Sequence, residues 1–427
     1  MSASKPPPPT SAAVLTRLPE VRTWQEDFYR NLHAHPELSH HEVATAGAVA
    51  QSLRADGFEV HEGIGGTGVV GLLRNGDGPT VLARADMDAL PVQELTELPY
   101  ASEVVVKGAS GDEVPVMHAC GHDVHVTCLL GAARLLSAAR DQWAGTLVAL
   151  FQPAEETGDG ARGMVDGGLT TVVPRIDVAM AQHVLALPAG DVATRVGPVL
   201  AAADSLRITV FGRGSHGSMP HASVDPVVLA AMIVVRLQTV VSRETRPGEP
   251  VVVTVGSLRA GTKSNVIADR AVIELNVRTF SEASRAATLA AITRIVNAEC
   301  DASGSPRPAT FELFDQFGLT DNDEAVTSRV AAAFDAHFGP RAHAIEAQSA
   351  SEDFSDLAHA YGAPYTYWGI GGTDPDLFDR ALRAGRVASD VPVNHSGYFA
   401  PVIQPTLDTG TEALVVAALA WLAQPLV

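Results

Sequence analysis

The sequence contains few cysteines and few aromatic residues. Aromatic side chains make up 5% of its 427 residues, and only Cys120, Cys128 and Cys300 are cysteines. An odd number of cysteines in a long chain argues against a disulfide framework and predicts a reducing compartment. A cysteine with a special role is therefore expected to act in metal binding or catalysis.

Basic side chains are also scarce, with 30 Lys and Arg against 49 Asp and Glu and a net charge of −19. Such a chain would repel a nucleic-acid backbone, and no basic cluster offers an exception. The longest apolar runs, near residues 226–235 and 413–423, fall short of the ~20 residues that span a bilayer, and the first ten residues lack the apolar core of a signal peptide. We therefore expect a cytoplasmic protein that acts on a small molecule and binds neither nucleic acid nor membrane.

The length predicts two or three domains. A proline run from Pro6 to Pro9 predicts a disordered tail over residues 1–12. After an amphipathic helix at residues 42–56, apolar runs alternate with helical stretches, which predicts an α/β fold whose central, mostly parallel sheet is flanked by helices. The expected strands are residues 69–73, 80–85, 146–151, 178–182 and 365–368, and the main expected helix is 124–139. The glycine run 369–372, after the last of these strands, is expected to be a flexible loop.

The pattern changes after Val196 to strand, helix, strand, strand, helix, strand. This order is the split βαβ, or ferredoxin-like, arrangement and predicts an inserted domain over residues 197–314. The catalytic domain would then comprise residues 13–196 and 315–427. The expected elements of the insert are 206–211, 225–241, 251–256, 271–278, 281–299 and 309–313.

Potential metal-binding side chains occur where the apolar strands run out. Asp86, the pair Glu155 and Glu156, and His183 each follow one of these strands. In open α/β sheets, ligands bind at the carboxyl ends of the strands, so these side chains are expected at one edge. His395, near the end of the resumed domain, could reach the same edge.

Cys120 and His122 lie on a short loop before the helix that begins near Val124, and Gly121 gives the backbone freedom between them. A thiolate and an imidazole suit zinc, and further carboxylate and imidazole ligands also admit manganese, cobalt or nickel. For the pair alone, a buried cysteine beside a helix-capping histidine is the favoured alternative.

Glu155 and Glu156 are adjacent, and adjacent side chains in an extended chain point different ways. One can bind metal while the other takes a proton from water and passes it to a leaving amine. The spacing leaves open which glutamate does which, and an isolated pair would favour two solvated acids at the start of a loop.

Six segments, in this order, closely resemble the aminoacylase and hippurate-hydrolase branch of the two-metal carboxypeptidases. That branch includes N-acyl-amino-acid amidohydrolases and plant auxin-conjugate hydrolases, and the resemblance runs from about Asn31 to about Phe399. The segments are residues 84–91, 118–123, 151–156, 215–218, 351–354 and 394–396.

The resemblance implies two divalent metal ions per subunit, zinc first, with Cys120 bridging them and Glu155 as the general base. It also implies that Asp86 accepts a hydrogen bond from a ligating imidazole and fixes its tautomer. A turn residue at the end of a strand is the alternative for Asp86. The implied metal ligands are Cys120, His122, Glu156, His183 and His395.

In the inserted domain, the resemblance implies that His216 polarises the scissile carbonyl from the neighbouring subunit of a homodimer or higher homo-oligomer. Asn265 and Arg278 match positions near the substrate carboxylate or carbonyl. The alternatives are a glycine-rich surface turn for His216 and a surface ion pair for Arg278. Arg84 departs from the wider carboxypeptidase family, where a metal-binding histidine is common, which puts dipeptidase specificity in doubt.

The predicted function is metal-dependent hydrolysis of N-acyl amino acids, with N-acetyl, N-benzoyl or longer acyl groups, to a carboxylic acid and a free amino acid. A dipeptidase, an N-carbamoyl-amino-acid hydrolase and a succinyl-diaminopimelate deacylase are alternatives with the same chemistry. A thiol hydrolase with Cys120 as nucleophile and a catalytically silent binding protein are the rivals from other classes. Loss of activity to a chelator and its recovery with metal would separate the enzyme from both.

Overall fold

The computed structural model describes residues 11–108 and 111–422, which form two compact units. The second unit comprises Leu200–Thr320 and Ala347–Glu352, and the first contains the rest of the chain. The second unit therefore differs from the expected insert, 197–314, at both ends and includes a separate later segment. Of the expected tail, residues 1–10 lie outside the described residues, whereas Ser11 and Ala12 begin helix α1 (Ser11–Leu15).

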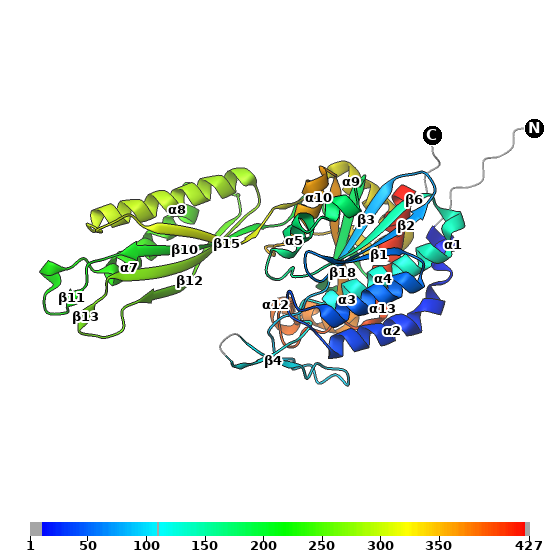
Figure 1. Cartoon of the computed structure of the whole chain (residues 1–427), viewed down its shortest axis with the longest axis horizontal. Coiled ribbons are helices and arrows are strands. Elements are labelled where there is room, and N and C mark those ends of the chain that lie inside the picture. Colours follow the sequence, from blue (N-terminus) through cyan, green and yellow to red (C-terminus); the bar gives the residue numbers. More distant parts are fainter. Residues whose placement is uncertain (1–10, 109–110, 423–427) are drawn as a thin grey trace, which may run out of the picture. The chain divides into compact units, whose positions relative to one another are not determined.

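The first unit is built on an eight-stranded sheet with the order β1-β2-β6-β3-β7-β18-β8-β17 (Figure 1). The central strands β6, β3, β7 and β18 are parallel neighbours, whereas β1, β2 and β6 pair antiparallel at one side. The predicted mostly parallel α/β sheet is confirmed. The strands are β1 (Glu59–Ile64), β2 (Gly68–Asn75), β3 (Thr80–Asp86), β6 (Gly145–Gln152), β7 (Val178–Pro188), β8 (Val192–Thr194), β17 (Ala342–Ala344) and β18 (Tyr365–Thr373).

Helices cover both faces of this sheet. On one face, α4 (His122–Ala138) packs against β3 and against α13 (Ile403–Leu422), with α2 (Leu18–Ala34) and α3 (Val43–Ala55) beside them. On the other face, α5 (Gly160–Asp166) and α10 (Phe354–Tyr361) pack against β6 and β7. Nearly every residue of α4 is buried, because the helix lies between the sheet and the outer helices.

Two strands run further than the sequence predicted. The strand expected to end at Gln182 continues to Pro188, and the glycine run 369–372, expected to be a flexible loop, is the second half of β18. A Cβ on Gly371 would lie 1.8 Å from the carbonyl oxygen of Pro188. Glycine is needed there because β7 approaches closely, and not because the chain is flexible.

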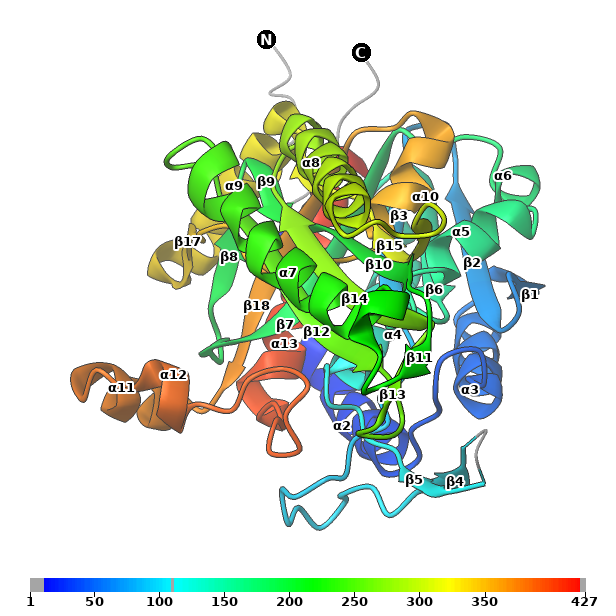
Figure 2. The same cartoon turned by 90° about the vertical axis from the view of Figure 1, so that its left-hand side faces the viewer.

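The second unit contains a four-stranded antiparallel sheet with the order β12-β14-β10-β15, covered on one face by α7 (Pro226–Thr239) and α8 (Glu282–Ala302) (Figure 2). The chain order β10-α7-β12-β14-α8-β15 is the predicted ferredoxin-like arrangement. Its strands are β10 (Ala202–Phe211), β12 (Val251–Ala260), β14 (Arg270–Thr279) and β15 (Thr310–Phe317).

Helix α7 continues into a π-helical turn, Val240–Glu244. Within the described residues, one helix, Pro226–Glu244, is long and apolar enough to cross a membrane by length and composition. The apolar run estimated from the sequence, residues 226–235, was shorter than this helix. Its inner side chains Leu229, Ile233 and Leu237 are buried in the core of the second unit.

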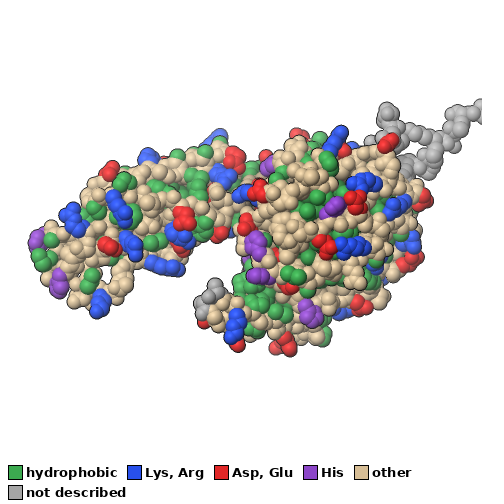
Figure 3. Space-filling model, viewed as in Figure 1, with side chains coloured by type: hydrophobic (Ala, Val, Ile, Leu, Met, Phe, Trp, Pro, Cys, Tyr) green, Lys and Arg blue, Asp and Glu red, His purple; other side chains and the backbone are tan. Residues whose placement is uncertain are grey.

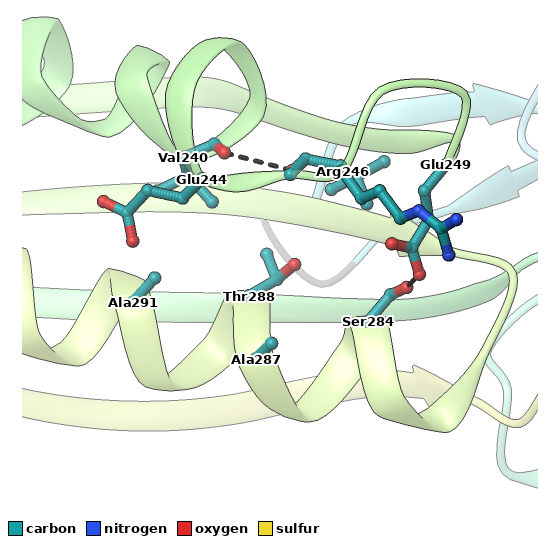
Figure 4. Close-up of a pocket in the computed structure, with 10 residues that line it drawn as sticks. Val240, Glu244, Arg246, Glu249, Ser284, Ala287, Thr288 and Ala291 are labelled. Carbon is teal, nitrogen blue, oxygen red and sulfur yellow. Dashed lines mark hydrogen bonds between the residues drawn. The ribbon is translucent and has the colours of Figure 1, made fainter.

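A cavity of about 200 Å³ lies between this π-helical turn, the start of β12 and α8 (Figure 4). Both of its carboxylates are engaged within the unit, because Glu244 pairs with Arg294 and Glu249 accepts a hydrogen bond from Ser284. The cavity contains none of the predicted site residues.

Candidate metal centre

Asp86 is the last residue of β3, Glu155 and Glu156 follow β6, and His183 lies in β7 beyond its pairing with β3. The carboxyl ends of these parallel strands meet at one edge of the sheet, as ligand sites in open α/β sheets do. Cys120 and His122 reach this edge from the loop before α4.

Gly121 separates the cysteine and the histidine of that loop. Its φ of 87° is in the left-handed region, and a Cβ there would lie 2.3 Å from Cγ1 of Val184. Glycine therefore meets both a conformational and a spatial requirement between Cys120 and His122.

The structure brings all five predicted metal ligands together. Cys120 belongs to two of the groups whose ligand atoms lie within 4.8 Å of one another. The Sγ of Cys120 is 3.4 Å from Nε2 of His183, and Nε2 of His395 is 3.4 Å from Oε1 of Glu156. Three of the five groups contain the predicted ligands and base: Cys120, His122 and His183; Cys120, Glu156 and His395; and His122, Glu155 and Glu156. The other two are Asp86, His122 and His125, and Glu155, Glu352 and Asp353. The assigned roles as ligands and base stay predictions.

Hydrogen bonds fix the tautomers of two of these histidines. The Nδ1 of His122 lies 2.8 Å from the carbonyl oxygen of Asp88, and that of His183 lies 2.8 Å from the carbonyl oxygen of Val184. A carbonyl only accepts, so each Nδ1–H donates and each Nε2 keeps its lone pair for a metal. Nε2 of His122 is buried and has no hydrogen-bond partner among the described residues. A metal ion would satisfy this atom, so these residues fit the predicted group.

The electrostatics of the site also favour a cation. Burial and the nearby Glu156 raise the pKa of Cys120, so its thiolate needs added positive charge. Burial and the neighbouring His125 hold the pKa of His183 well below its usual range, which keeps this imidazole neutral. Hydrogen bonds to Cys120 and Glu156 raise the pKa of His395 to about 10. Cys120 and Glu156 thus favour a positive charge on His395, and a metal ion bound by these three side chains would supply that charge.

Asp86 has a different partner from the one expected. The sequence predicted a hydrogen bond from a ligating imidazole, but Oδ1 of Asp86 lies 2.5 Å from Nδ1 of His125, and Oδ2 accepts from Arg84 at 2.6 Å. Nε2 of the predicted ligand His122 is 3.7 Å away. Burial alone would raise the pKa of Asp86, but the Arg84 guanidinium and both imidazoles hold it well below its usual range.

The remaining predicted site residues lie in the second unit, at two places. His216, in β11 (Ser215–His216), pairs with Val266 of β13 (Val266–Ile267), and the carbonyl oxygen of Asn265 accepts the N–H of Gly217 at 2.8 Å. His216 and Asn265 are thus neighbours, and both are exposed. Histidine side chains are visible at this end of the unit, which carries β11 (Figure 3).

Arg278 lies at the opposite end of β14, paired with Ala203 and Val252. It donates hydrogen bonds to the carbonyl oxygen of Ser349 and to Oγ of Ser351. Its donors meet a carbonyl and a hydroxyl, and not the carboxylate of a surface ion pair. The structure does not bring Arg278 together with His216 and Asn265 within this unit.

The sequence pattern of peptidase family M20/M25/M40 matches residues 82–381. The chain belongs to this family. It is 39% identical over 316 residues to thermostable carboxypeptidase 2 of Saccharolobus solfataricus, which covers 73% of this chain and 77% of that protein. It is 40% identical over 285 residues to hippurate hydrolase of Campylobacter jejuni, covering 65% and 71% respectively.

Among solved structures, a dinuclear metal-binding M20 peptidase of Bacillus subtilis superposes with a TM-score of 0.74 at 29% identity, covering 95% of this chain and 98% of that one. The predicted resemblance to the hippurate-hydrolase branch and the predicted enzyme class, an amidohydrolase, are confirmed by these relatives.

Arg84, the departure noted in the sequence, forms a buried network in this M20 chain. Its guanidinium donates to Gln152 at 2.9 Å and to Asp86, and it lies 3.3 Å from a carboxylate oxygen of Asp353. A positive charge that is fixed beside Asp86 and Asp353 cannot act as a metal ligand. This side chain therefore organises the carboxylates around the centre.

Three residues near the centre were missed by sequence reasoning. His125 donates to Asp86, and its Nε2 accepts the N–H of Val184 at 2.8 Å, so both nitrogens are used and it orients its neighbours. Asn394 donates to the carbonyl oxygens of Cys120 and Val184, each at 3.1 Å, which places the turn that carries His395. Asp88 accepts from His122. Asp88 and Asn394 lie in two of the segments that carry the family resemblance, and His125 follows the predicted ligand His122 by three residues, but these signals did not indicate their contacts.

Proposed function

We propose that this M20 enzyme hydrolyses the amide bond of N-acyl amino acids, with N-acetyl, N-benzoyl or longer acyl groups, and releases a carboxylic acid and a free amino acid. The observation that carries the proposal is a pair of metal-donor groups that share Cys120 and lie beside the buried carboxylate of Glu155. The similarity to hippurate hydrolase supports the choice of substrate class.

We assign two divalent ions to the donors Cys120, His122, Glu156, His183 and His395, with zinc first and manganese, cobalt or nickel as alternatives. When bound, such ions polarise the scissile carbonyl and lower the pKa of a water molecule. Thiolate and imidazole donors favour zinc over magnesium or calcium, which prefer all-oxygen sites.

Glu155 is the proposed general base. Its Oε2 lies 3.9 Å from Nε2 of His122, the same distance as Oε1 of Glu156, so its carboxylate is next to the proposed metal donors. Its carboxylate takes a proton from the attacking water and then delivers that proton to the amide nitrogen as the carbon–nitrogen bond breaks. Glu156 keeps its charge for metal binding.

His216, Asn265 and Arg278 bind the other parts of the substrate. Nε2–H of His216 donates to the carbonyl oxygen as negative charge develops there, since its Nδ1 accepts the N–H of Ser218 at 3.2 Å. We assign Asn265 and Arg278 to the substrate carboxylate or carbonyl.

These residues come from two subunits in our proposal. Arg278 is near one end of β14, whereas His216 lies beyond the other end, at Arg270, and a strand of that length spans about 30 Å. The chain enters and leaves this sheet at the Arg278 end, where Ala203 of β10 pairs with Phe317 of β15. Arg278 and His216 of one chain are therefore too far apart to contact the same small substrate. In our proposal, each site takes Arg278 from one chain and His216 from its partner.

The surface of the second unit supports a homodimer. Val228, Met232 and Val235 on the outer face of α7 are 59%, 48% and 67% exposed, and β12 is an edge strand of the sheet. Exposed apolar side chains beside an unpaired edge are typical of an interface. Val228→Glu with Val235→Glu should give monomers of low activity in light-scattering chromatography, whereas Leu382→Glu, at a 58% exposed leucine of the first unit, should leave the dimer intact.

We place the enzyme in the cytoplasm, because all three cysteines are free and buried. No two of these cysteines are exposed to form a disulfide bond in this fold.

The test is a substrate panel in which acyl group and amino acid vary separately, run before and after dialysis against a chelator and after addition of zinc, manganese or cobalt. We expect cleavage of N-acyl amino acids that is lost to the chelator and restored by metal. Dipeptides belong in the panel as the second candidate, because the Saccharolobus solfataricus relative is a carboxypeptidase, and N-carbamoyl amino acids as the third. Activity that survives the chelator but is lost on alkylation of Cys120 would identify a thiol hydrolase instead.

A further inference from the structure

The loop after β6, which carries Glu155 and Glu156, has an unusual backbone. Its Ala154 has a φ of 51°, in the left-handed region that residues other than glycine seldom adopt. Ala154 is fully buried. Because Ala154 directly precedes Glu155, its conformation sets the direction in which the Glu155 side chain leaves the backbone.

A buried carboxylate holds this conformation. Oε1 of Glu42 accepts the N–H of Ala154 at 2.8 Å, although the two residues are 112 positions apart. The same oxygen accepts the N–H of His40 at 3.0 Å, and Oε2 accepts the hydroxyl of Thr67 at 2.6 Å. Glu42 is 0% exposed, so an unpaired carboxylate or an unpaired Ala154 N–H would be costly there.

The backbone on the other side of Glu155 is held by a second carboxylate. Oδ2 of Asp88 accepts the N–H of Glu156 at 3.0 Å. Asp88 also contacts His122 and is thus part of the metal centre. The hydrogen bonds of Glu42 go instead to two backbone N–H groups and one hydroxyl, so Glu42 holds the backbone before the base without contact to a predicted metal ligand.

We propose that Glu42 is a positioning residue for Glu155: by holding the N–H of Ala154 it fixes the left-handed turn and directs the Glu155 carboxylate to the attacking water. Asp88 holds the adjoining ligand Glu156 independently. A hydrogen bond to a charged acceptor is about twice as strong as a neutral one, which suits a bond that must maintain a strained backbone. The inference rests on the proposed function, in which Glu155 is the general base.

The test begins with Glu42→Ala in the full-length, metal-loaded enzyme. A displacement of a catalytic group by about 1 Å costs roughly 100-fold in rate, so we expect kcat to fall by about that factor. KM and the metal content by elemental analysis should stay at wild-type values, because the metal ligands keep their partners. Glu42→Gln keeps an acceptor oxygen and should lose only about tenfold, since its bond is neutral.

A second substitution tests the role of the backbone itself. Glycine adopts positive φ without steric cost. A glycine at position 154 should therefore depend less than alanine on the Glu42 hydrogen bond to keep this backbone conformation. We expect Ala154→Gly alone to be close to wild type and the double variant Glu42→Ala with Ala154→Gly to have a higher kcat than Glu42→Ala. Such non-additivity measures the coupling between the two positions.

Glu37→Ala is the matched control. The carboxylate of Glu37 accepts the N–H groups of Ala44 at 3.0 Å and Thr45 at 2.9 Å, in the helix that follows Glu42, and none in the loop after β6. Its loss should lower Tm and leave kcat unchanged. If Glu42→Ala changes only Tm, as Glu37→Ala does, or if it loses metal, the positioning role is wrong.

Glu155→Gln in the same series separates this inference from the proposed function. An inactive Glu155→Gln beside a fully active Glu42→Ala would overturn only the positioning role. An active Glu155→Gln would overturn the assignment of the base and the inference with it.

Discussion

Two predicted site histidines, His122 of the first unit and His216 of the second, are held in different ways. His122 in the first unit is fully buried, and its Nδ1 is bonded to Asp88, which is 34 positions away in the sequence. His216 in the second unit is exposed and bonded to Ser218, two positions away. The fold of the first unit therefore fixes His122 of the proposed metal centre in advance, whereas the bond from Ser218 holds His216 only within its own loop.

This difference predicts which substitutions affect metal and which affect only turnover. In the first unit, the proposed ligand Glu156 and the proposed base Glu155 are adjacent residues, and their substitutions should have separate effects. In the second unit, no substitution should change the metal content. The predictions below test this contrast from the largest expected effect to the smallest.

The largest effect is expected for Glu155→Gln. General acid–base catalysis contributes about 10²–10⁴-fold, so kcat should fall by at least about 100-fold, with the metal content unchanged in elemental analysis. Glu156→Gln should instead lose metal. Full occupancy in Glu156→Gln together with metal loss in Glu155→Gln would mean that the two assignments are reversed.

An intermediate effect is expected when two inactive variants are mixed. Glu155→Gln and His216→Ala should each be nearly inactive as homodimers. When equal amounts of the two variants are refolded together, about half of the dimers are heterodimers. One site of each heterodimer keeps Glu155 from one chain and His216 from the other, so activity should recover to about a quarter of wild type. No recovery, with heterodimers confirmed by mass spectrometry, would contradict the contribution of His216 from the partner subunit.

A smaller effect, on stability, is expected at His33. Its Nδ1 lies 2.6 Å from a carboxylate oxygen of Asp123 and its Nε2 lies 3.1 Å from one of Glu94. Burial alone would lower the pKa of His33, but the bonds to Asp123 and Glu94 outweigh it and raise the pKa to about 10. His33 is therefore a buried imidazolium between two carboxylates.

A pKa that is raised on folding adds stability below the unfolded pKa, and that stability is lost as the pH rises through the folded pKa. The contribution of His33 should thus be complete below about pH 6.5 and disappear towards pH 10, on the order of a few kcal/mol. Tm measured across this range should fall more steeply in wild type than in His33→Gln. Parallel curves would show that His33 is not charged in the folded protein.

The elements that the sequence predicted best are those buried on both faces. Strands β3 and β6 were predicted within a residue or two, because their apolar runs are continuous and bounded by turn residues. The glycine run 369–372 was misassigned because its reason lies elsewhere, in the close approach of Pro188. No local pattern contains that information.

The proposed ligand set followed from the family resemblance, but the residues that support it did not. Asn394 contacts Cys120 across 274 positions and Glu42 contacts Ala154 across 112, so neither role exists before the chain has folded. His125 follows His122 by three residues on the same helix, but its role was overlooked. That role depends on its bonds to Asp86 and to the N–H of Val184, which lie on strands β3 and β7, and the sequence does not show these contacts.

The central claim, that the first unit alone holds two divalent ions through the shared thiolate of Cys120, is tested most directly by metal stoichiometry. Elemental analysis of metal-loaded wild type, Cys120→Ala and His216→Ala should give two ions per chain for wild type and His216→Ala. Cys120→Ala should retain less than one, since both donor groups lose their common member. Two ions per chain in Cys120→Ala, or an active wild type without metal, would contradict the account.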